Sequence, residues 1–273
     1  MNDEFLSVDD LEFKNKNKFS KRKSYSIITG GAGRIGSVYT SVLLKKGFNV
    51  IIASRKNNLF LKYKSSLERN YQKKIEWMKL DLTNLVSVRK FASRVLKKNI
   101  CHLINNASLS NRGQFFKYDE KNIVKENLGV NLGSIFLTER IVTLMRKKKT
   151  GRIIFTGSLW GSMTPRFDTY LEMNNGPSAL IASGKASIEQ YAKYIAVREA
   201  VNNIKVNILL PGWFPRKGRV ERKDYINKIL HNIPMSRIGN LKDLVKPIEF
   251  LLSEENDYMT GQSLIIDGGY SLY

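Results

Sequence analysis

The most constraining stretch of this chain is a glycine cluster at residues 29–36, which reads T-G-G-A-G-R-I-G. An apolar run at residues 25–28 leads into the cluster, and an amphipathic run at residues 37–46 follows it. The order strand, glycine turn, helix is typical of a site for the pyrophosphate group of a dinucleotide. Glycine lets the backbone turn sharply and approach phosphate oxygens, and the helix N-terminus presents unpaired N–H groups to them. The predicted binding residues in this turn are Thr29, Gly30, Gly33, Arg34, Ile35 and Gly36.

Apolar, β-rich runs alternate with helical patterns along the rest of the chain. We expect strands at residues 24–29, 49–53, 75–79, 102–105, 151–156, 204–210 and 263–267. We expect helices near residues 35–46, 58–72, 84–98, 119–147, 179–202, 222–230 and 241–253. This alternation predicts a parallel sheet with helices on both faces. The expected fold is therefore α/β of the Rossmann type, a doubly wound, parallel seven-stranded sheet in a three-layer α/β/α arrangement.

The expected domain organisation is simple. No internal repeat and no linker rich in proline or glycine interrupts residues 24–273, so we expect these residues to form one domain. Residues 1–23 are polar, acidic first and then lysine-rich, which predicts a poorly ordered extension.

Composition argues against several classes of protein. The net charge is +22, but the basic residues are scattered and do not alternate with aromatic residues as in sites that stack nucleic-acid bases. We therefore expect no nucleic-acid partner and assign the charge to attraction of small anionic molecules. No run approaches the ~18 apolar residues of a membrane helix. The acidic N-terminus lacks the pattern of a signal peptide.

Cysteine and histidine are scarce in this chain. Its one cysteine is Cys101 and its two histidines are His102 and His231. We therefore expect neither an internal disulfide nor a metal site, and a reducing cytoplasm is the simplest compartment. Cys101 and His102 lie in an apolar run, so they are expected to be strand residues packed in the core.

The end of the second expected strand indicates which dinucleotide binds. In a doubly wound fold this position meets the adenosine ribose, and an acidic residue there would hydrogen-bond the free 2′-hydroxyl. The sequence instead has Ser54 and Arg55 at this point, followed by Lys56. A guanidinium binds a phosphate through two parallel hydrogen bonds, so the sequence favours NADP(H) over NAD(H). The alternative is a pair of exposed bases on a lysine-rich protein.

Further motifs follow in order, and together they resemble the short-chain dehydrogenase/reductase family from residue 24 to the C-terminus. Besides the glycine turn, the matching segments are Asp81-Leu82-Thr83, Asn105-Asn106-Ala107-Ser108, Asn131, Gly157-Ser158, Pro211-Gly212, Thr260-Gly261-Gln262 and Asp267-Gly268-Gly269. The resemblance implies cofactor contacts from Asp81, Leu82, Asn105, Asn106, Ala107, Lys185, Pro211 and Gly212. One residue departs from the pattern, since the short enzymes usually have glycine where Arg34 stands. Arg34 is a second candidate for the 2′-phosphate.

The resemblance also implies where the catalytic residues lie. In the family, a tyrosine protonates the substrate oxygen as a hydride arrives from the nicotinamide. A lysine four residues later, on the same helix face, lowers the tyrosine pKa and holds the nicotinamide ribose. Ser158 matches the serine that positions the substrate oxygen, and Asn131 matches the residue that holds a proton-relay water. Lys185 matches the lysine, but the residue four positions before it is Ile181, which carries no proton.

Three other tyrosines are candidates for the missing proton donor. Tyr191 and Tyr194 follow the lysine on the same expected helix, and at about 100° per residue they point away from its face. Tyr170 lies 12 residues after Ser158, the family's usual spacing. It falls in a segment near residues 160–177 that looks like an insertion, which we expect to form a lid. Tyr170 either reaches the substrate from this lid or only packs the loop.

The absence of the family tyrosine leaves three interpretations open. In the first, an oxidoreductase acting on a carbonyl or hydroxyl group uses a substitute donor, such as Tyr170, water or a substrate hydroxyl. In the second, the enzyme performs a different redox step. In the third, the chain binds NADP(H) without turnover, as a regulatory or partner subunit.

Two segments bear on the substrate. Residues 173–177 end the insertion and resemble short-chain members of surface-sugar biosynthesis, including oxidoreductases associated with legionaminic and other nonulosonic acids. The loop at residues 213–219 reads W-F-P-R-K-G-R, an aromatic floor with Arg216, Lys217 and Arg219. Such a loop suits a phosphorylated or nucleotide-linked sugar. The alternative is a solvated basic loop.

The resemblance implies the assembly state as well. Family members associate, so we expect a homodimer or homotetramer. The expected contact surfaces are the helices around residues 119–147 and 179–202. Beyond copies of itself, the expected partner is a small-molecule substrate, without a membrane or nucleic acid.

Overall fold

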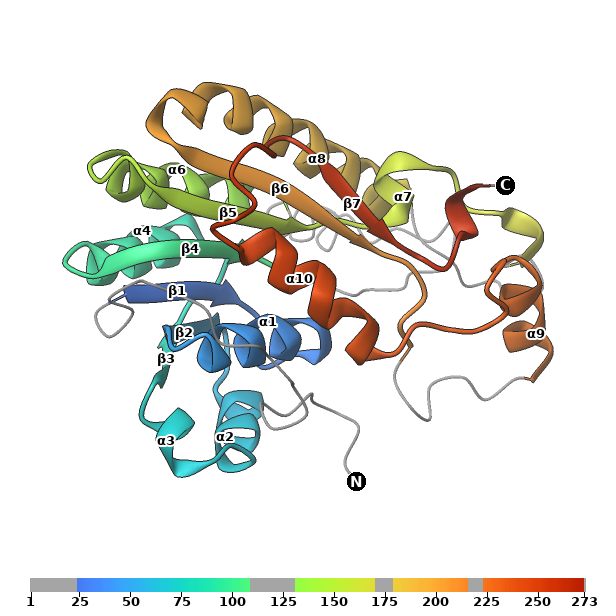
Figure 1. The fold of residues 1–273 in the computed structure, drawn as a ribbon, viewed down its shortest axis with the longest axis horizontal. Coiled ribbons are helices and arrows are strands. Elements are labelled where there is room, and N and C mark those ends of the chain that lie inside the picture. Colours follow the sequence, from blue (N-terminus) through green and yellow to red (C-terminus); the bar gives the residue numbers. More distant parts are fainter. Residues whose placement is uncertain (1–23, 109–130, 170–178, 216–222, 273) are drawn as a thin grey trace.

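The computed structural model describes residues 24–108, 131–169, 179–215 and 223–272. Its centre is a sheet of seven parallel strands in the order β3-β2-β1-β4-β5-β6-β7 (Figure 1). The strands are β1 (Ser24–Thr29), β2 (Asn49–Ser54), β3 (Ile75–Lys79), β4 (Asn99–Asn105), β5 (Gly151–Thr156), β6 (Ile204–Pro211) and β7 (Ser263–Ile266). The strand order reverses between β1 and β4, and this confirms the doubly wound fold expected from the sequence.

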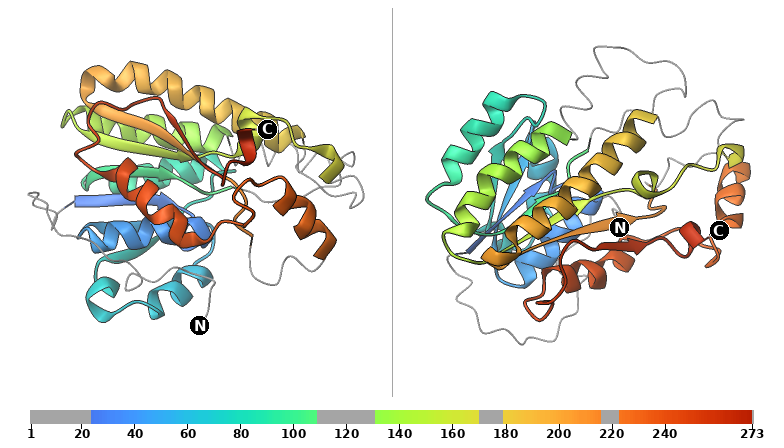
Figure 2. Two further views of the ribbon diagram at one scale, coloured as in Figure 1. Left: turned by 45° about the vertical axis from the view of Figure 1, so that its right-hand side comes forward. Right: turned by 90° about the horizontal axis from the view of Figure 1, so that it is seen from above.

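Helices cover both faces of the sheet. The α-helices are α1 (Arg34–Lys45), α2 (Asn58–Ser65), α3 (Arg69–Gln72), α4 (Leu85–Val95), α6 (Gly133–Arg146), α7 (Leu159–Ser162), α8 (Ala179–Glu199), α9 (Lys223–His231) and α10 (Val245–Leu252). Short 3₁₀ helices are η3 (Phe167–Thr169), η5 (Ala200–Asn202), η6 (Leu241–Leu244) and η7 (Tyr270–Leu272). α1 packs with α10 on one face, while α4, α6 and α8 pack side by side on the other. The view from above in Figure 2 shows the sheet between these two layers.

The strands are apolar on both faces because both faces are covered. Ile27 and Ile51 belong to the core beneath α4, α6 and α8, whereas their neighbours Ile28 and Ile52 belong to the core beneath α1 and α10. All four side chains are fully buried. Successive side chains in a strand point to opposite faces, so a continuous apolar run is what a doubly covered strand requires.

Two expected helices differ from the structure in extent. The segment expected as one helix at residues 58–72 forms two, α2 and α3. Between them Leu67 is buried in the core, and Glu68 has extended backbone angles that end the helical path. The segment expected at residues 241–253 opens with the 3₁₀ helix η6 before α10 begins. Of the helix expected at residues 119–147, the structure describes the part from α6 onward, and residues 1–23 lie outside the described residues.

Strand β4 begins at Asn99, three residues before its expected start. The Asn99 Nδ2 donates to the Ser24 Oγ at 3.1 Å, which joins the polar start of β4 to the start of β1. His102 is a buried strand residue, as expected, and its Nδ1 hydrogen-bonds the Ser26 Oγ at 2.9 Å. Cys101 is partly buried and packs against the core beneath α1 and α10, which also contains Phe48, the residue whose ring contacts His102. These contacts give both residues the structural role expected from the sequence.

Candidate active site

The glycine turn has the shape that close approach of a phosphate requires. Gly30 has a left-handed φ of +65°, and its N–H donates to the Ala53 carbonyl at 2.8 Å. A Cβ at Gly36 would stand 2.2 Å from the Gly30 carbonyl oxygen, so only glycine fits there. α1 starts at Arg34 with Gly33 as its N-cap, and no described side chain caps it. The first N–H groups of α1 therefore face the turn without a side-chain acceptor.

The end of β4 holds this turn in place. The Thr29 Oγ1 accepts hydrogen bonds from the backbone N–H groups of Asn106 and Ala107, both at 2.9 Å. The Asn106 Nδ2 donates to the Thr29 carbonyl at 3.1 Å. Asn105 is buried and its Nδ2 donates to the Thr138 Oγ1 of α6 at 2.9 Å. The two asparagines thus join β1, β4 and α6, and they support the turn from beneath.

A pocket with about 510 Å³ of empty space opens beside the turn. Asp81 is held at its wall, because its Oδ1 accepts from the Thr83 N–H at 2.9 Å and from the Thr83 hydroxyl at 2.7 Å. The predicted cofactor residues that line this pocket are Thr29, Gly30, Ser54, Arg55, Asp81, Leu82 and Ala107.

Arg55 and Ser54 play different parts in this pocket. The Ser54 hydroxyl accepts from the Trp77 Nε1 at 2.9 Å and donates to the Lys56 carbonyl at 2.8 Å, so it shapes the turn after β2. Arg55 is exposed and has no hydrogen-bond or ion-pair partner among the described residues. An uncapped helix start, a glycine with no room for a Cβ and an exposed guanidinium together fit a phosphate-bearing dinucleotide.

A second pocket, with about 520 Å³ of empty space, lies where β5 and β6 end. The Ser158 Oγ lies at the start of α7, where it accepts from the Trp160 N–H at 3.3 Å. The Gly212 N–H donates to the Ile266 carbonyl of β7 at 2.9 Å. The residues that line the pocket are Ser158, Leu159, Trp160, Pro211, Gly212, Trp213, Phe214 and Pro215. The structure thus brings the predicted Ser158 and the predicted Pro211–Gly212 loop to one cavity.

Lys185 lies beneath this region on α8. Its side chain is buried, and its Nζ donates to the Thr156 carbonyl at the end of β5, at 2.9 Å. Burial lowers the pKa of Lys185 to about 8, and the carboxylate of Glu189, one helical turn later, opposes this shift. The ammonium is therefore held at the strand that leads directly to Ser158.

Asn131 contacts α8 beside Lys185. Both polar atoms of its side chain lie 3.2 Å from where a Cβ on Gly184 would stand. Glycine at that position therefore lets α6 bring Asn131 to the helical turn that carries Lys185. Ser158, Lys185 and Asn131 come from three elements that converge at the carboxyl ends of the strands, where ligands of open α/β sheets bind.

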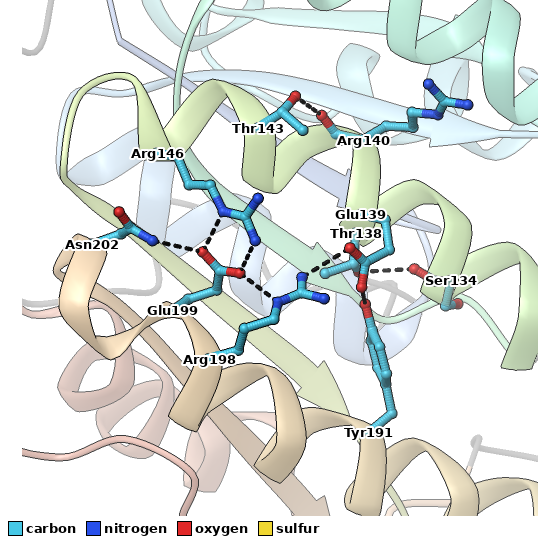
Figure 3. Close-up of polar contacts among 10 residues, drawn as sticks. All are labelled: Ser134, Thr138, Glu139, Arg140, Thr143, Arg146, Tyr191, Arg198, Glu199 and Asn202. Atoms are coloured by element: carbon cyan, nitrogen blue, oxygen red, sulfur yellow. Dashed lines mark hydrogen bonds and ion pairs between the residues drawn. The ribbon is translucent and has the colours of Figure 1, made fainter.

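A buried carboxylate fixes α8 against α6 (Figure 3). Glu199, at the end of α8, is fully buried and accepts from the Arg146 Nε at 2.7 Å and from the Arg198 Nε at 2.7 Å. The Asn202 Nδ2 adds a hydrogen bond at 3.1 Å. The hydrogen bond from Arg146 is the main reason that the pKa of Glu199 falls to about 2. The charge of this carboxylate is thus compensated within the fold.

A known family model agrees with this geometry. The model described as Enoyl-(Acyl carrier protein) reductase matches residues 31–271. The chain is 28% identical over 250 residues to 3-oxoacyl-[acyl-carrier-protein] reductase FabG of Salmonella typhimurium, which covers 89% of this chain and 96% of that protein. The chain belongs to the short-chain dehydrogenase/reductase family. It is therefore an oxidoreductase of the short-chain type.

Other short-chain relatives extend the comparison. The chain is 25% identical over 252 residues to Post-translational flagellin modification protein A of Campylobacter coli, across 90% of this chain and 97% of that protein. The crystal structure of a short chain dehydrogenase from Leptospira borgpetersenii with bound NAD⁺ superposes with a TM-score of 0.79 at 26% identity. That superposition covers 95% of this chain and 100% of the Leptospira chain. The Leptospira protein thus binds NAD⁺.

Ile181 stands at the position where the sequence predicts the family tyrosine. α8 begins at Ala179, so Ile181 and Lys185 are both helical and one turn apart. The two tyrosines later on α8 do not line the second pocket. The Tyr191 hydroxyl donates to the Glu139 carboxylate on α6 at 2.8 Å (Figure 3). Tyr194 is 62% exposed on the outer face of α8. Neither hydroxyl therefore takes the place of the family tyrosine.

Arg34 lies elsewhere than a 2′-phosphate role requires. It does not line the pocket with Arg55. Its Nη1 donates instead to the Phe214 carbonyl in the loop after β6, at 2.6 Å. The guanidinium thus points from the glycine turn toward the loop that lines the second pocket.

Several sequence-based expectations lie outside the described residues. They are Tyr170, the sugar-type segment at residues 173–177, and Arg216, Lys217 and Arg219 of the basic loop. The first part of the insertion near residues 160–177 is described, and it forms α7 and η3. No helix in the described ranges is long and apolar enough to cross a bilayer. Within the same ranges, no three side chains of His, Cys, Asp or Glu gather as metal ligands do.

Sequence reasoning missed the residues that join α7 to α8. The Ser162 Oγ donates to both oxygens of the Glu189 carboxylate, at 2.8 and 3.0 Å. A Cβ at Gly161 would stand 2.5 Å from the Glu189 Oε1, so glycine is needed for this approach. Helical spacing could have found Glu189, because it lies one turn after Lys185. Ser162 carries no comparable local signal.

Proposed function

We propose that this chain is an NADP(H)-dependent oxidoreductase that interconverts a carbonyl and a hydroxyl group on a sugar or sugar-derived metabolite. The proposed preference for NADP(H) rests on the position of Arg55. Its guanidinium is exposed at the pocket beside the glycine turn, lacks a partner in the described part of the chain, and stands where an acidic residue would favour NAD(H). The Leptospira relative binds NAD⁺, so the proposed preference rests on this chain's own residue at the end of β2.

In the proposed reaction the bound nicotinamide supplies or accepts the hydride. The Ser158 hydroxyl hydrogen-bonds the substrate oxygen, and Lys185 binds the nicotinamide ribose and tunes the proton network. Asn131, next to the turn of Lys185, holds a relay water. Because Ile181 has no proton to give, the proton comes from Tyr170, from water or from a substrate hydroxyl.

Two observations support a sugar-derived substrate. One relative is named a flagellin modification protein. The second pocket is flanked by the indoles of Trp160 and Trp213, and aromatic rings pack well against sugar rings. The FabG relative suggests a different substrate, an acyl thioester on a carrier protein, and the experiment below includes that alternative.

We also propose that the protein is a homodimer or homotetramer that contacts its copies through α6 and α8. Supporting this, both helices expose large apolar side chains on their outer faces. These are Leu132 at 43%, Phe136 at 40%, Tyr194 at 62% and Val197 at 79% exposure. The single cysteine, Cys101, supports the reducing cytoplasm as its compartment.

Isoleucine at position 181, which has no proton to donate, favours one alternative function. In this alternative, the chain binds NADP(H) without turnover. Such a protein would keep the glycine turn and Arg55 but would act through a partner. This alternative predicts tight binding of NADPH and no change in absorbance with any substrate.

The deciding experiment has two stages. Calorimetric titration with NADPH and NADH first measures the cofactor preference, and we expect NADPH to bind more tightly. Absorbance at the nicotinamide band is then followed with phosphorylated sugars, nucleotide sugars and an acetoacetyl thioester. Turnover with a sugar supports the proposal, and turnover with the thioester alone replaces the substrate class. Equal affinity for both cofactors would contradict the role of Arg55.

A further inference from the structure

The loop after β6, at residues 212–215, packs against the cores on both faces of the sheet. Trp213 packs against the core beneath α4, α6 and α8, whereas Phe214 packs against the core beneath α1 and α10. Both residues also line the cavity that contains Ser158. The position of this loop at residues 212–215 therefore shapes the cavity that contains Ser158.

Arg34 connects this loop to the glycine turn. It is the first residue of α1, and its Nη1 donates to the Phe214 carbonyl at 2.6 Å across 180 positions of sequence. The side chain is half-buried. A guanidinium has five N–H donors in a fixed plane, so it can hold a carbonyl oxygen and an anion at the same time.

Gly239 holds Phe214 from the other side. The Gly239 N–H donates to the Trp213 carbonyl at 2.8 Å. A Cβ on Gly239 would stand 2.5 Å from the Phe214 Cε1, so the ring occupies the space that any larger residue would fill. The loop thus rests between Arg34 and Gly239.

We propose that Arg34 is a positioning residue that ties the loop at residues 212–215 to the glycine turn, so that an anion bound at the turn sets the position of Trp213 and Phe214 beside the substrate. The proposal rests on the proposed function in that it assumes a dinucleotide at the turn. The proposal gives Arg34 a role on the substrate side of the site. The glycine that short-chain enzymes usually have at this position has no side chain and could not contact the loop.

Fluorescence of Trp213 tests the proposal directly. The chain has three tryptophans, so a W77F/W160F background leaves Trp213 as the only one. The probe is 2′-phospho-ADP-ribose, which carries the pyrophosphate and the 2′-phosphate but lacks the nicotinamide that could touch or quench the indole. We expect saturable binding and a change in Trp213 emission. In R34Q we expect the probe to bind, by calorimetry, with the emission change lost.

Matched variants separate position from affinity. R55A should weaken binding about tenfold or more, because a charge-assisted hydrogen bond is lost, yet keep the full emission change at saturation. R34K should recover part of the change, since an ammonium can still donate to the carbonyl. G239A displaces Phe214 without touching the turn, so it should remove the change at unaltered affinity. If R34Q does not fold, the G239A variant still tests the proposal.

The outcomes are distinguishable. A full emission change in R34Q or G239A with bound probe overturns the role of Arg34 and leaves the proposed function standing. Failure of the probe to bind the W77F/W160F protein, and of NADPH to bind the wild-type chain, overturns both. With a substrate in hand, a raised KM at unchanged kcat in R34Q supports the positioning role, and an unchanged KM contradicts it.

Discussion

The two ends of the site are built from different chemistry. At the cofactor end, the shape comes from the backbone: a left-handed Gly30, a Gly36 with no room for a Cβ and an uncapped helix start. At the catalytic end, the chemistry depends on single side chains, Ser158 and Lys185, and on the residue one turn before the lysine. A site built from backbone depends little on which side chains surround it, whereas the catalytic end depends on one position, and the sequence predicts Ile181 where the family has its proton donor.

The difference teaches that binding and turnover can separate within one fold. The cofactor end tolerates arginine in place of the usual glycine at position 34, because this side chain leaves the turn and bonds the loop after β6. The catalytic end cannot accept such a replacement at its proton donor, since the donor must lie within hydrogen-bond reach of the substrate oxygen. Four predictions follow in order of decreasing effect on the measured quantity.

Ser158→Ala tests whether the catalytic end works at all. We expect turnover to fall by about 10²–10³, the usual effect of removing a positioned hydrogen-bond donor at a reacting oxygen. NADPH affinity should stay unchanged, because Ser158 does not line the cofactor pocket. Ser187→Ala, on the exposed face of α8, is the control. A serine variant with wild-type turnover would place the reaction elsewhere.

Ile181→Tyr restores the spacing of the family's tyrosine and lysine. α8 holds both positions one turn apart, so the new phenol meets Lys185 on one helix face. We expect turnover to rise by about 10² if the wild-type chain lacks an efficient donor. Ile181→Phe adds the same ring without the hydroxyl and should give no rise. Unchanged turnover in the tyrosine variant, combined with loss in Tyr170→Phe, would instead identify Tyr170 as the donor.

Arg55→Ala tests whether the cofactor end of the site prefers NADPH to NADH. Loss of charge-assisted hydrogen bonds to a 2′-phosphate should weaken NADPH binding by about 1.5–3 kcal/mol, or roughly 10- to 100-fold. NADH lacks that phosphate, so its affinity should not change. Lys56→Ala removes the neighbouring exposed base and serves as the control. Equal losses for both cofactors would show that Arg55 acts only through general attraction.

The titration of Lys185 should have the smallest of the four effects, on the free energy of unfolding and on turnover. Burial lowers its pKa to about 8, whereas the unfolded value is 10.5. Below pH 8 both states hold the proton, and the cost of burying the charge is present in full. Between pH 8 and 10.5 the unfolded state binds more protons, so the free energy of unfolding should rise relative to a variant without the group. Turnover should decline severalfold over the same range as the ammonium is lost.

Denaturation at pH 7 to 10 measures this dependence. Lys185→Met removes the titrating group, so its free energy of unfolding should not show the rise. Lys193→Met, which removes an exposed amine from the same helix, should behave as wild type. Identical pH profiles for wild type and Lys185→Met would mean that the buried amine does not titrate in this window.

Local features of the chain were predictable because local physics decides them. The glycine turn follows from backbone sterics, the sheet from continuous apolar runs, and the pairing of Ile181 with Lys185 from helical spacing. Element ends were less predictable. Burial of Leu67 divides α2 from α3, and the polar Asn99 belongs to β4 because it bonds Ser24 on the neighbouring strand.

By itself, the sequence determined the family, and it predicted the dinucleotide turn and the replacement of the family tyrosine by Ile181, since each depends on residues within a few positions of one another. Only the tertiary structure decided which distant side chains meet. Arg34 reaches Phe214, Trp77 holds Ser54, Asn131 lies against Gly184 and Ser162 binds Glu189. The physical reason is that parallel strands are joined by long crossovers, so the ends that meet at the site are far apart in the chain, and their contacts depend on strand order and helix packing.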